Sequence, residues 1–165
     1  MFSMVSRWTR RRFLSTFGGT AIVGVTGCLE SEGEQPSFED TLAVTTATQF
    51  SSPGCSCCGE YATYLRQYLD IELGERYPSD IESIKQQYGV PDELLSCHTL
   101  VLDDLVVEGH VPVEAIATAL EQQSVSGIAL PGMPSGSPGM PGEQTEPFTI
   151  YSFESGEIGD VFIEL

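Results

Sequence analysis

Basic residues are scarce in this chain of 165 residues, where 7 Lys and Arg stand against 24 Asp and Glu and give a net charge of −17. A nucleic-acid-binding protein needs a basic face, so this charge argues against that class. The length excludes a multi-domain enzyme, because one domain takes about 100–200 residues. The nucleophile-elbow and His-Glu-x-x-His motifs of hydrolases are also absent. The informative residues are therefore the few Arg, Cys, His and Met.

The first 27 residues have the features of an export signal. Four of the seven basic residues lie within the first twelve positions, and an uncharged stretch follows at 13–27. The Arg-Arg-Phe-Leu string at 11–14 resembles a twin-arginine signal, and Val25-Thr26-Gly27-Cys28 resembles a lipobox with Cys28 as the lipidated residue. An uncleaved anchor is the alternative, although a membrane span needs about 20 residues. We predict an exported lipoprotein on the outer face of the cytoplasmic membrane.

Acidic residues dominate the remainder of the chain. After residue 27 there are three basic residues against 24 acidic ones, a net charge of −21. Such a protein repels itself in dilute buffer, whereas concentrated salt screens the repulsion. The even spread of the acids therefore predicts a halophilic protein rather than an acidic binding site. Residues 28–40 are polar and predict a disordered tether, and residues 41–165 form the predicted domain.

Hydrophobic periodicity predicts an α/β fold for this domain. A capping box at Ser79-Asp80-Ile81-Glu82 begins the second predicted helix, Gly89 ends it, and Pro112 opens the third. The predicted strands are 41–48, 70–73, a hairpin of 100–102 and 105–107 about Asp103-Asp104, and 148–153 with 161–165 at the end of the chain. The order β-α-β-α-β-β-α resembles the thioredoxin fold over about 41–123. A Met/Pro/Gly loop at about 131–142 and a C-terminal β-hairpin are additions to that core.

Three cysteines, Cys55, Cys57 and Cys58, lie in the loop between the first predicted strand and helix. Outside the cytoplasm two disulfides are one outcome, for instance Cys55 with Cys58 and Cys57 with Cys97. Three thiols within four residues make a poor framework, because a bridge that closes a short loop constrains the unfolded chain little. The same crowding suits a soft metal, which binds several converging thiolates. The alternatives are thus a disulfide framework and a metal site.

Cys97 distinguishes these alternatives. In proteins with the thioredoxin fold the residue just before the third strand, usually a cis-proline, packs against the redox pair. Cys97-His98-Thr99 occupies that position here, so a fourth sulfur and an imidazole are expected beside the first three. A metal site needs ligands at that point, whereas a thioredoxin needs an inert residue. We interpret the pattern as a redox scaffold converted into a metal site.

His98 and His110 are the two histidines, and the loop at 131–141 repeats Pro-Gly-Met-Pro with Met133 and Met140. A lone histidine is more often structural than a ligand, but His98 adjoins a clustered cysteine, and His110 follows the hairpin. Thioether sulfur is a soft ligand for copper(I), so a lid that presents both methionines is one interpretation of the loop. A flexible Pro/Gly connector is the other.

These motifs together resemble one family. They are Cys55-x-Cys57-Cys58-Gly59, Ser96-Cys97-His98-Thr99, Glu108-Gly109-His110-Val111-Pro112 and the Pro-Gly-Met-Pro loop. The chain is similar from about 41 to 165 to the CopG-like group of exported proteins associated with copper resistance. The resemblance implies a thioredoxin-like domain that binds copper through the clustered cysteines. His98, His110 and the two methionines are its accessory candidates.

The leading functional hypothesis is an exported, lipid-anchored protein that sequesters, transfers or redox-converts copper, with copper(I) preferred by thiolates. Copper ions, other exported copper-handling proteins and, through the lipid, the membrane are the expected partners. A thiol–disulfide oxidoreductase with Cys55 as nucleophile and Cys58 as resolving thiol is the alternative. A zinc or iron–sulfur protein is the third hypothesis.

Overall fold

The computed structural model of the chain describes residues 40–165. The predicted signal, the lipobox with Cys28 and the tether up to residue 39 lie outside the described residues. Within the described part, no helix is both long enough and apolar enough to cross a bilayer.

A seven-stranded mixed sheet organises residues 40–165, in the order β2-β1-β3-β4-β5-β6-β7. The strands are β1 (Ala47–Ser51), β2 (Gly74–Arg76), β3 (His98–Leu102), β4 (Leu105–Glu108), β5 (Gly127–Ala129), β6 (Thr149–Glu154) and β7 (Glu157–Glu164). The β1–β2 and β4–β5 pairs are parallel, and the other four pairs are antiparallel. This is the mixed α/β class that hydrophobic periodicity predicts.

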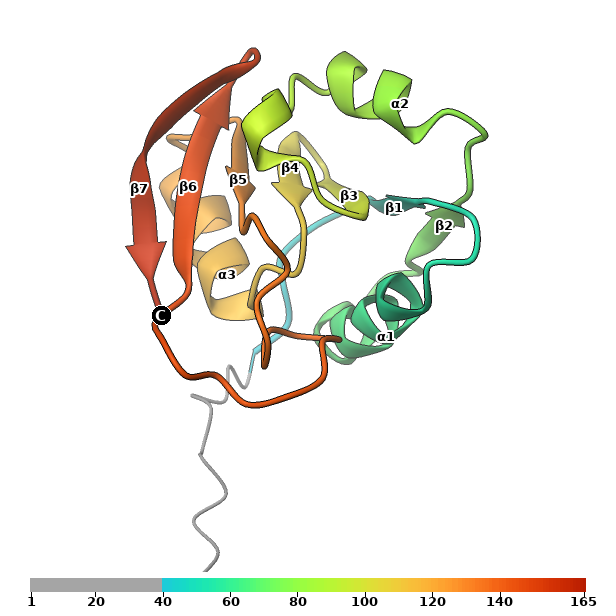
Figure 1. Cartoon of the computed structure of the whole chain (residues 1–165), viewed down its shortest axis with the longest axis horizontal. Helices are drawn as coiled ribbons and strands as arrows, with labels where there is room; N and C mark the ends of the chain where they lie inside the picture. Colours follow the sequence, from blue (N-terminus) through green and yellow to red (C-terminus); the bar gives the residue numbers. More distant parts are fainter. Residues whose placement is uncertain (1–39) are drawn as a thin grey trace, which may run out of the picture. The chain divides into compact units, whose positions relative to one another are not determined.

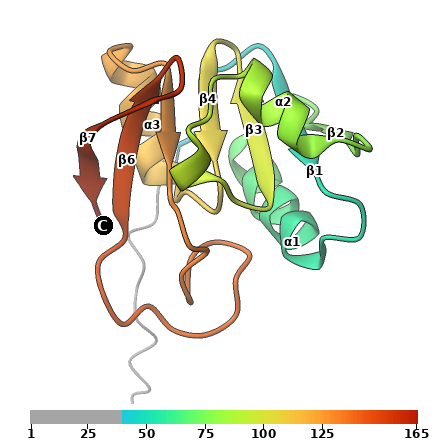
Figure 2. The same ribbon diagram turned by 45° about the horizontal axis from the view of Figure 1, so that its top comes forward.

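Helices cover both faces of the sheet. The α-helices are α1 (Ser56–Leu65), α2 (Ile81–Gln87) and α3 (Val113–Gln122), and the short 3-10 helices are η1 (Arg66–Tyr68) and η2 (Asp92–Leu94). Helices α1 and α3 lie on one face and α2 on the other (Figure 1, Figure 2). Because successive strand residues point to opposite faces, Val107 joins the core under α1 and α3, whereas Val106 joins the smaller cluster with Val90 and Leu94.

The predicted alternation of elements is confirmed from β1 to α3, as is the C-terminal hairpin of β6 and β7. Asp103, in the turn between β3 and β4, has a φ of 49°, and Gly89, just after α2, has a φ of 66°. Both values lie in the left-handed region that tight turns and helix ends require.

The predicted ranges of the first two strands are wrong. The segment 41–48 does alternate, and Leu42 and Val44 are buried, but β1 begins only at Ala47. The amides of Thr45 and Thr46 donate to the carboxylate of Asp103 instead of to a neighbouring strand. The segment predicted as a second strand, 70–73, precedes β2. The alternating pattern identified the buried side chains correctly. The segment is not a strand before Ala47, because the Asp103 carboxylate, and not a neighbouring strand, accepts the backbone hydrogen bonds of Thr45 and Thr46.

Two further details differ from the sequence-based expectation. The N-cap of α2 is Asp80 and not Ser79, since the Asp80 carboxylate accepts from the amide of Ser83 at 3.0 Å. Strand β5 was not predicted, because three residues between a helix and a loop give no detectable alternation. It pairs with both β4 and β6 and thereby joins the C-terminal hairpin to the rest of the sheet.

Candidate metal centre

The pairing of β1 with β3 brings the four predicted cysteines together. Ser51, the last residue of β1, pairs with His98, the first residue of β3. Because the strands are antiparallel, the loop that leaves β1 and the segment that enters β3 lie at the same end of the sheet. Cys55 is the N-cap of α1 in that loop, and Cys97 directly precedes β3. The topology therefore brings to one end of the sheet two segments whose cysteines are far apart in sequence.

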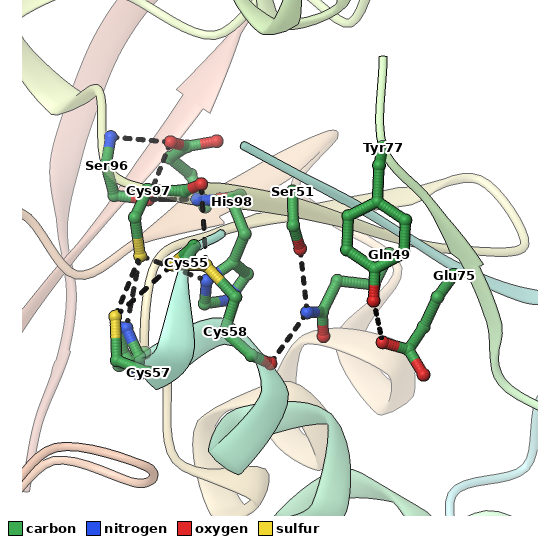
Figure 3. Close-up of a disulfide and its surroundings, with 12 residues drawn as sticks. Gln49, Ser51, Cys55, Cys57, Cys58, Glu75, Tyr77, Ser96, Cys97 and His98 are labelled. Carbon is green, nitrogen blue, oxygen red and sulfur yellow. Dashed lines mark hydrogen bonds between the residues drawn. A yellow bond between two sulfur atoms is a disulfide. The ribbon is translucent and has the colours of Figure 1, made fainter. Parts of the chain in front are cut away.

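The sulfur atoms lie within reach of one ion. All four ligand atoms of Cys55, Cys57, Cys58 and Cys97, here called the cysteine cluster, are within 4.8 Å of one another. The sulfur of Cys57 is 3.4 Å from that of Cys55 and 3.7 Å from that of Cys97 (Figure 3). This convergence is the donor arrangement that a soft metal ion prefers.

One disulfide is present within the cluster. Cys55 and Cys58 are bonded, and Cys57 and Cys97 are the free cysteines of the described residues. Of the two bridges considered as alternatives to a metal site, the structure thus contains the first and not the second. Reduction of the Cys55–Cys58 bond yields two additional thiols at the same place, so the oxidation state of this pair sets the number of thiolates available.

Both predicted histidines lie beside Cys97. The Cys97 sulfur is 3.4 Å from Nδ1 of His98 and 3.3 Å from Nε2 of His110, and these three residues form a second group of ligand atoms within 4.8 Å. Nδ1 of His110 lies 2.7 Å from the carbonyl oxygen of Pro138, which can only accept, so Nδ1 carries the proton. Nε2 of His110 then directs a lone pair at the Cys97 sulfur, as in histidines that bind metals.

The two imidazoles are neutral at physiological pH. Burial, and then the proximity of His110 and Lys85, lower the pKa of His98 to about 3, and burial also lowers the pKa of His110. Nε2 of His98 is buried and has no hydrogen-bond partner in the part of the chain that the structure describes. A buried neutral imidazole with one unpartnered nitrogen, and with its other nitrogen 3.4 Å from the Cys97 sulfur, fits a metal ligand better than a satisfied core histidine.

The thiol of Cys97 is protonated in the metal-free protein. Burial, followed by the neighbouring Cys57, raises its pKa to about 12. A cation that binds the Cys97 thiolate must therefore displace a proton, and binding is coupled to pH.

Tyr61 supports both histidines and is not among the site residues that the sequence predicts. Its ring is fully buried, and its centroid is 4.5 Å from that of His98 and 5.3 Å from that of His110. Its hydroxyl donates to the carbonyl of Val111 at 2.8 Å. A tyrosine three residues after the cysteine motif is the signal that could have identified this contact.

A buried glutamine also contacts the motif and was missed from the sequence. The Gln49 side chain, on β1, donates to the Cys58 carbonyl at 2.9 Å and to the Ser51 hydroxyl at 3.0 Å (Figure 3). Gln49 thus ties the first turn of α1 to the sheet. A single glutamine within a strand gives no sequence signal for such a role.

The methionine loop runs past the beginning of α1 (Figure 1). A Cβ atom added to Gly139 would lie 2.7 Å from the Tyr61 amide nitrogen and 3.1 Å from the Cys57 carbonyl oxygen, so the loop backbone packs directly on the cysteine motif. Met140 follows this glycine and is partly buried, whereas Met133 is 37% exposed. The loop therefore covers the site near Met140, and Met133 faces solvent.

Part of the site lies in a segment that matches a known protein family. A family described as "Protein of unknown function, DUF411" matches residues 94–140, which include Cys97, both histidines and both methionines. The comparison with curated proteins found no match.

Two solved structures are similar to the chain over most of its length. One is titled "Copper resistance protein copG- Form 1"; it is 31% identical with a TM-score of 0.66, and the match covers 74% of this chain and 98% of that chain. The other, "Copper resistance protein copG- Form 2", is 32% identical with a TM-score of 0.65 and coverages of 72% and 96%. With this identity over nearly the whole of both relatives, the chain belongs to the CopG-like copper-resistance family.

Proposed function

We propose that this chain binds copper(I) through the cysteine cluster and sequesters it or transfers it to other copper-handling proteins. The observation that carries the proposal is the convergence of the four ligand atoms within 4.8 Å of one another. Thiolates are soft ligands and favour copper(I) over harder divalent ions. The names of the two similar solved structures support copper as the ion.

The histidines and the methionine loop are the accessory ligands in this proposal. Cys97 belongs to both groups of convergent ligand atoms, one with the other cysteines and one with His98 and His110. A thiolate shared in this way allows the site to hold more than one copper ion. Met140 lies next to the loop residue that packs on Cys57, so it is a better candidate than the exposed Met133.

Redox conversion of copper forms a further part of the proposal. The disulfide accepts two electrons and two protons from an external thiol or another reductant and becomes the two thiols Cys55 and Cys58. The reduced pair then completes a four-sulfur set for copper(I). Oxidation of copper(I) to copper(II) at this site balances when two copper(I) ions supply the two electrons of that disulfide reduction and the solvent supplies the two protons. Thiolates and neutral imidazoles together can bind both oxidation states.

The fold suggests how such a site arose. The β2-β1-β3-β4 part of the sheet, with the cysteine motif between β1 and α1, supports a thioredoxin-like core. Cys97 then stands where that fold needs an inert residue.

The proposal also includes the location of the protein. It comprises export through the twin-arginine signal, lipidation of Cys28, attachment to the outer face of the membrane and adaptation to concentrated salt.

A thiol–disulfide oxidoreductase is the second candidate, and the Cys55–Cys58 disulfide favours it. In that reaction a substrate dithiol attacks the disulfide and is itself oxidised to a disulfide, while Cys55 and Cys58 are reduced to two thiols. This activity needs neither Cys97 nor a metal. It therefore survives chelation and a Cys97→Ser substitution, whereas copper binding does not.

The experiment that tests the proposal is a copper(I) titration of the reduced chain in high salt, against a chromophoric chelator. We expect Cys97→Ser to weaken binding by at least about tenfold, since even the loss of a supporting partner of a metal ligand costs about 10- to 100-fold. Cys28→Ser, which changes the cysteine outside the described residues, is the matched control and should bind as the original chain does. Equal affinities in Cys97→Ser and the original chain would contradict the proposal, and metal analysis would reveal zinc or iron instead.

A further inference from the structure

A buried ion pair lies behind the segment that carries Cys97. Lys85, on α2, and Glu108, on β4, form a salt bridge, and their side chains are 3% and 0% exposed. The other ion pair of the described residues, Arg66 with Glu75, is exposed at 46% and 26%. Burial of two charges costs desolvation free energy, and an apolar pair of similar volume is often as stable. The stability of the fold alone therefore does not explain this pair.

The Glu108 carboxylate is surrounded by donors. One oxygen accepts from the Lys85 ammonium and from both the amide and the hydroxyl of Ser96, the latter two at 2.7 Å. The other oxygen accepts from the hydroxyl of Thr99 at 2.6 Å, and Lys85 also donates to that hydroxyl at 3.0 Å. This network connects α2, β3 and β4 at one buried point and holds the carboxylate in a single orientation.

Ser96 connects this network to the metal centre. It lies between η2, which ends at Leu94, and β3, which begins at His98, so no regular element fixes the intervening Cys97. The Cys97 carbonyl accepts from the Ser52 amide at 3.5 Å, which is a long bond. The Ser96 hydroxyl also lies 3.0 Å from the His98 carbonyl oxygen, so Ser96 anchors the chain on both sides of the cysteine. Figure 3 shows Ser96 and Cys97 side by side.

From these contacts we propose that Lys85 and Glu108 are positioning residues for the metal centre. Glu108 fixes Ser96 and thereby holds the Cys97 sulfur next to Cys57. Lys85 neutralises the carboxylate and orients it toward Ser96. The inference rests on the proposed function only where copper is measured, since the spacing of the two sulfurs is a property of the metal-free protein as well.

The test compares Lys85→Met, Glu108→Gln, the double variant with both changes, and Ser96→Ala. Arg66→Gln is the matched control, because it removes one positive charge from the exposed ion pair. With Cys55 and Cys58 already oxidised, the rate at which diamide closes a Cys57–Cys97 disulfide reports the spacing of these two sulfurs. Iodoacetamide reactivity of the same thiols corrects for changes in accessibility, and copper(I) affinity is measured in parallel.

We expect Lys85→Met to slow closure of the second disulfide by at least about tenfold, because a misplacement of about 1 Å can slow bond formation about 100-fold. Lys85→Met leaves the buried Glu108 carboxylate without its countercharge, and Glu108→Gln leaves the buried Lys85 ammonium without its countercharge. Ser96→Ala removes the hydroxyl that donates to the carboxylate. All three should slow closure and weaken copper binding. The double variant keeps an oxygen acceptor for Ser96 and buries no charge, so its rate of disulfide closure should return to that of the original chain. The control Arg66→Gln should close at the original rate.

Two results would overturn the inference: a folded Lys85→Met variant that closes at the original rate, or a double variant as slow as Lys85→Met. If near-UV circular dichroism shows that Lys85→Met does not fold, Ser96→Ala decides, and an unchanged rate there overturns the inference. The failures are distinguishable. A chain that binds no copper but closes more slowly in these variants refutes the proposed function and supports the positioning role. Tight copper binding by the original chain, with unchanged rates of disulfide closure in these variants, supports the proposed function and refutes the positioning role.

Discussion

The sulfur atoms of Cys57 and Cys97 lie 3.7 Å apart, although 40 residues separate them in the chain. The antiparallel register of β1 and β3 produces this proximity, because it pairs Ser51 with His98. A disulfide does not enforce it, since both cysteines are free. Two unbonded thiols that the fold brings this close suit a site that binds and releases an ion.

The oxidation state of Cys55 and Cys58 should control copper(I) affinity. The disulfide removes two of the four sulfurs from the ligand set. We expect the oxidised protein to bind copper(I) at least about 100-fold more weakly than the reduced protein, since the loss of one outer partner already costs about 10- to 100-fold. A competition titration of both forms measures this. The Cys55→Ser/Cys58→Ser variant is the control, and its affinity should be low whether or not reductant is present; equal affinities of the two wild-type forms would contradict the expectation.

Copper binding should strengthen as the pH rises. The pKa of Cys97 is about 12, so its thiol is protonated throughout the range from pH 6 to pH 8 and must lose its proton to bind. Each proton released makes the affinity rise about tenfold per pH unit. His98, with a pKa of about 3, releases none in this range. Titrations at several pH values should give a slope lower by one proton in Cys97→Ser, and an unchanged slope would show that Cys97 does not bind as a thiolate.

Much of the site could be predicted from the sequence, because the cysteine motif is local and the position of Cys97 follows from the element order. The polar residues that support the site could not. Buried charges such as Lys85 and Glu108 are rare, so a sequence pattern assigns them to the surface. The Cys55–Cys58 bond remained one of several pairings, since spacing alone does not select a disulfide. The predicted range of β1 was wrong because the Asp103 carboxylate accepts from the amides of Thr45 and Thr46, and this tertiary contact leaves no pattern in the sequence.

The hydroxyl of Tyr61 should contribute measurably to stability. Tyr61→Phe keeps the ring against both histidines but leaves the buried Val111 carbonyl without this donor. We expect a loss of about 1–3 kcal/mol in the free energy of unfolding. Urea denaturation measures it. Tyr77→Phe is the matched control, because Tyr77 is 59% exposed, and its change should stay within about 0.5 kcal/mol. Equal losses in the two variants would be contrary to the described packing.

The two glycines of the repeated Pro-Gly-Met-Pro motif should respond differently to alanine. Gly132 and Gly139 have φ values of 79° and 78°, so alanine is strained at both, by about 1–2 kcal/mol. Only at Gly139 would the added Cβ meet other atoms, 2.7 Å from the Tyr61 amide nitrogen. Gly139→Ala should therefore cost about 1–3 kcal/mol more than Gly132→Ala and lift the loop from the cysteine motif. Faster copper(I) release from Gly139→Ala alone would support a covering role for the loop, and identical behaviour of both variants would argue against it.

Protection of the thiols tests the central claim most directly. The fully reduced chain is treated with iodoacetamide with and without bound copper(I), and mass spectrometry identifies the modified cysteines. Without the metal, Cys55, Cys57, Cys58 and Cys97 should all become alkylated under mildly denaturing conditions that preserve copper binding. With copper(I) bound, all four should be protected together. Stoichiometric copper on a chain whose four cysteines are alkylated at the metal-free rate would contradict a copper centre built from this cluster.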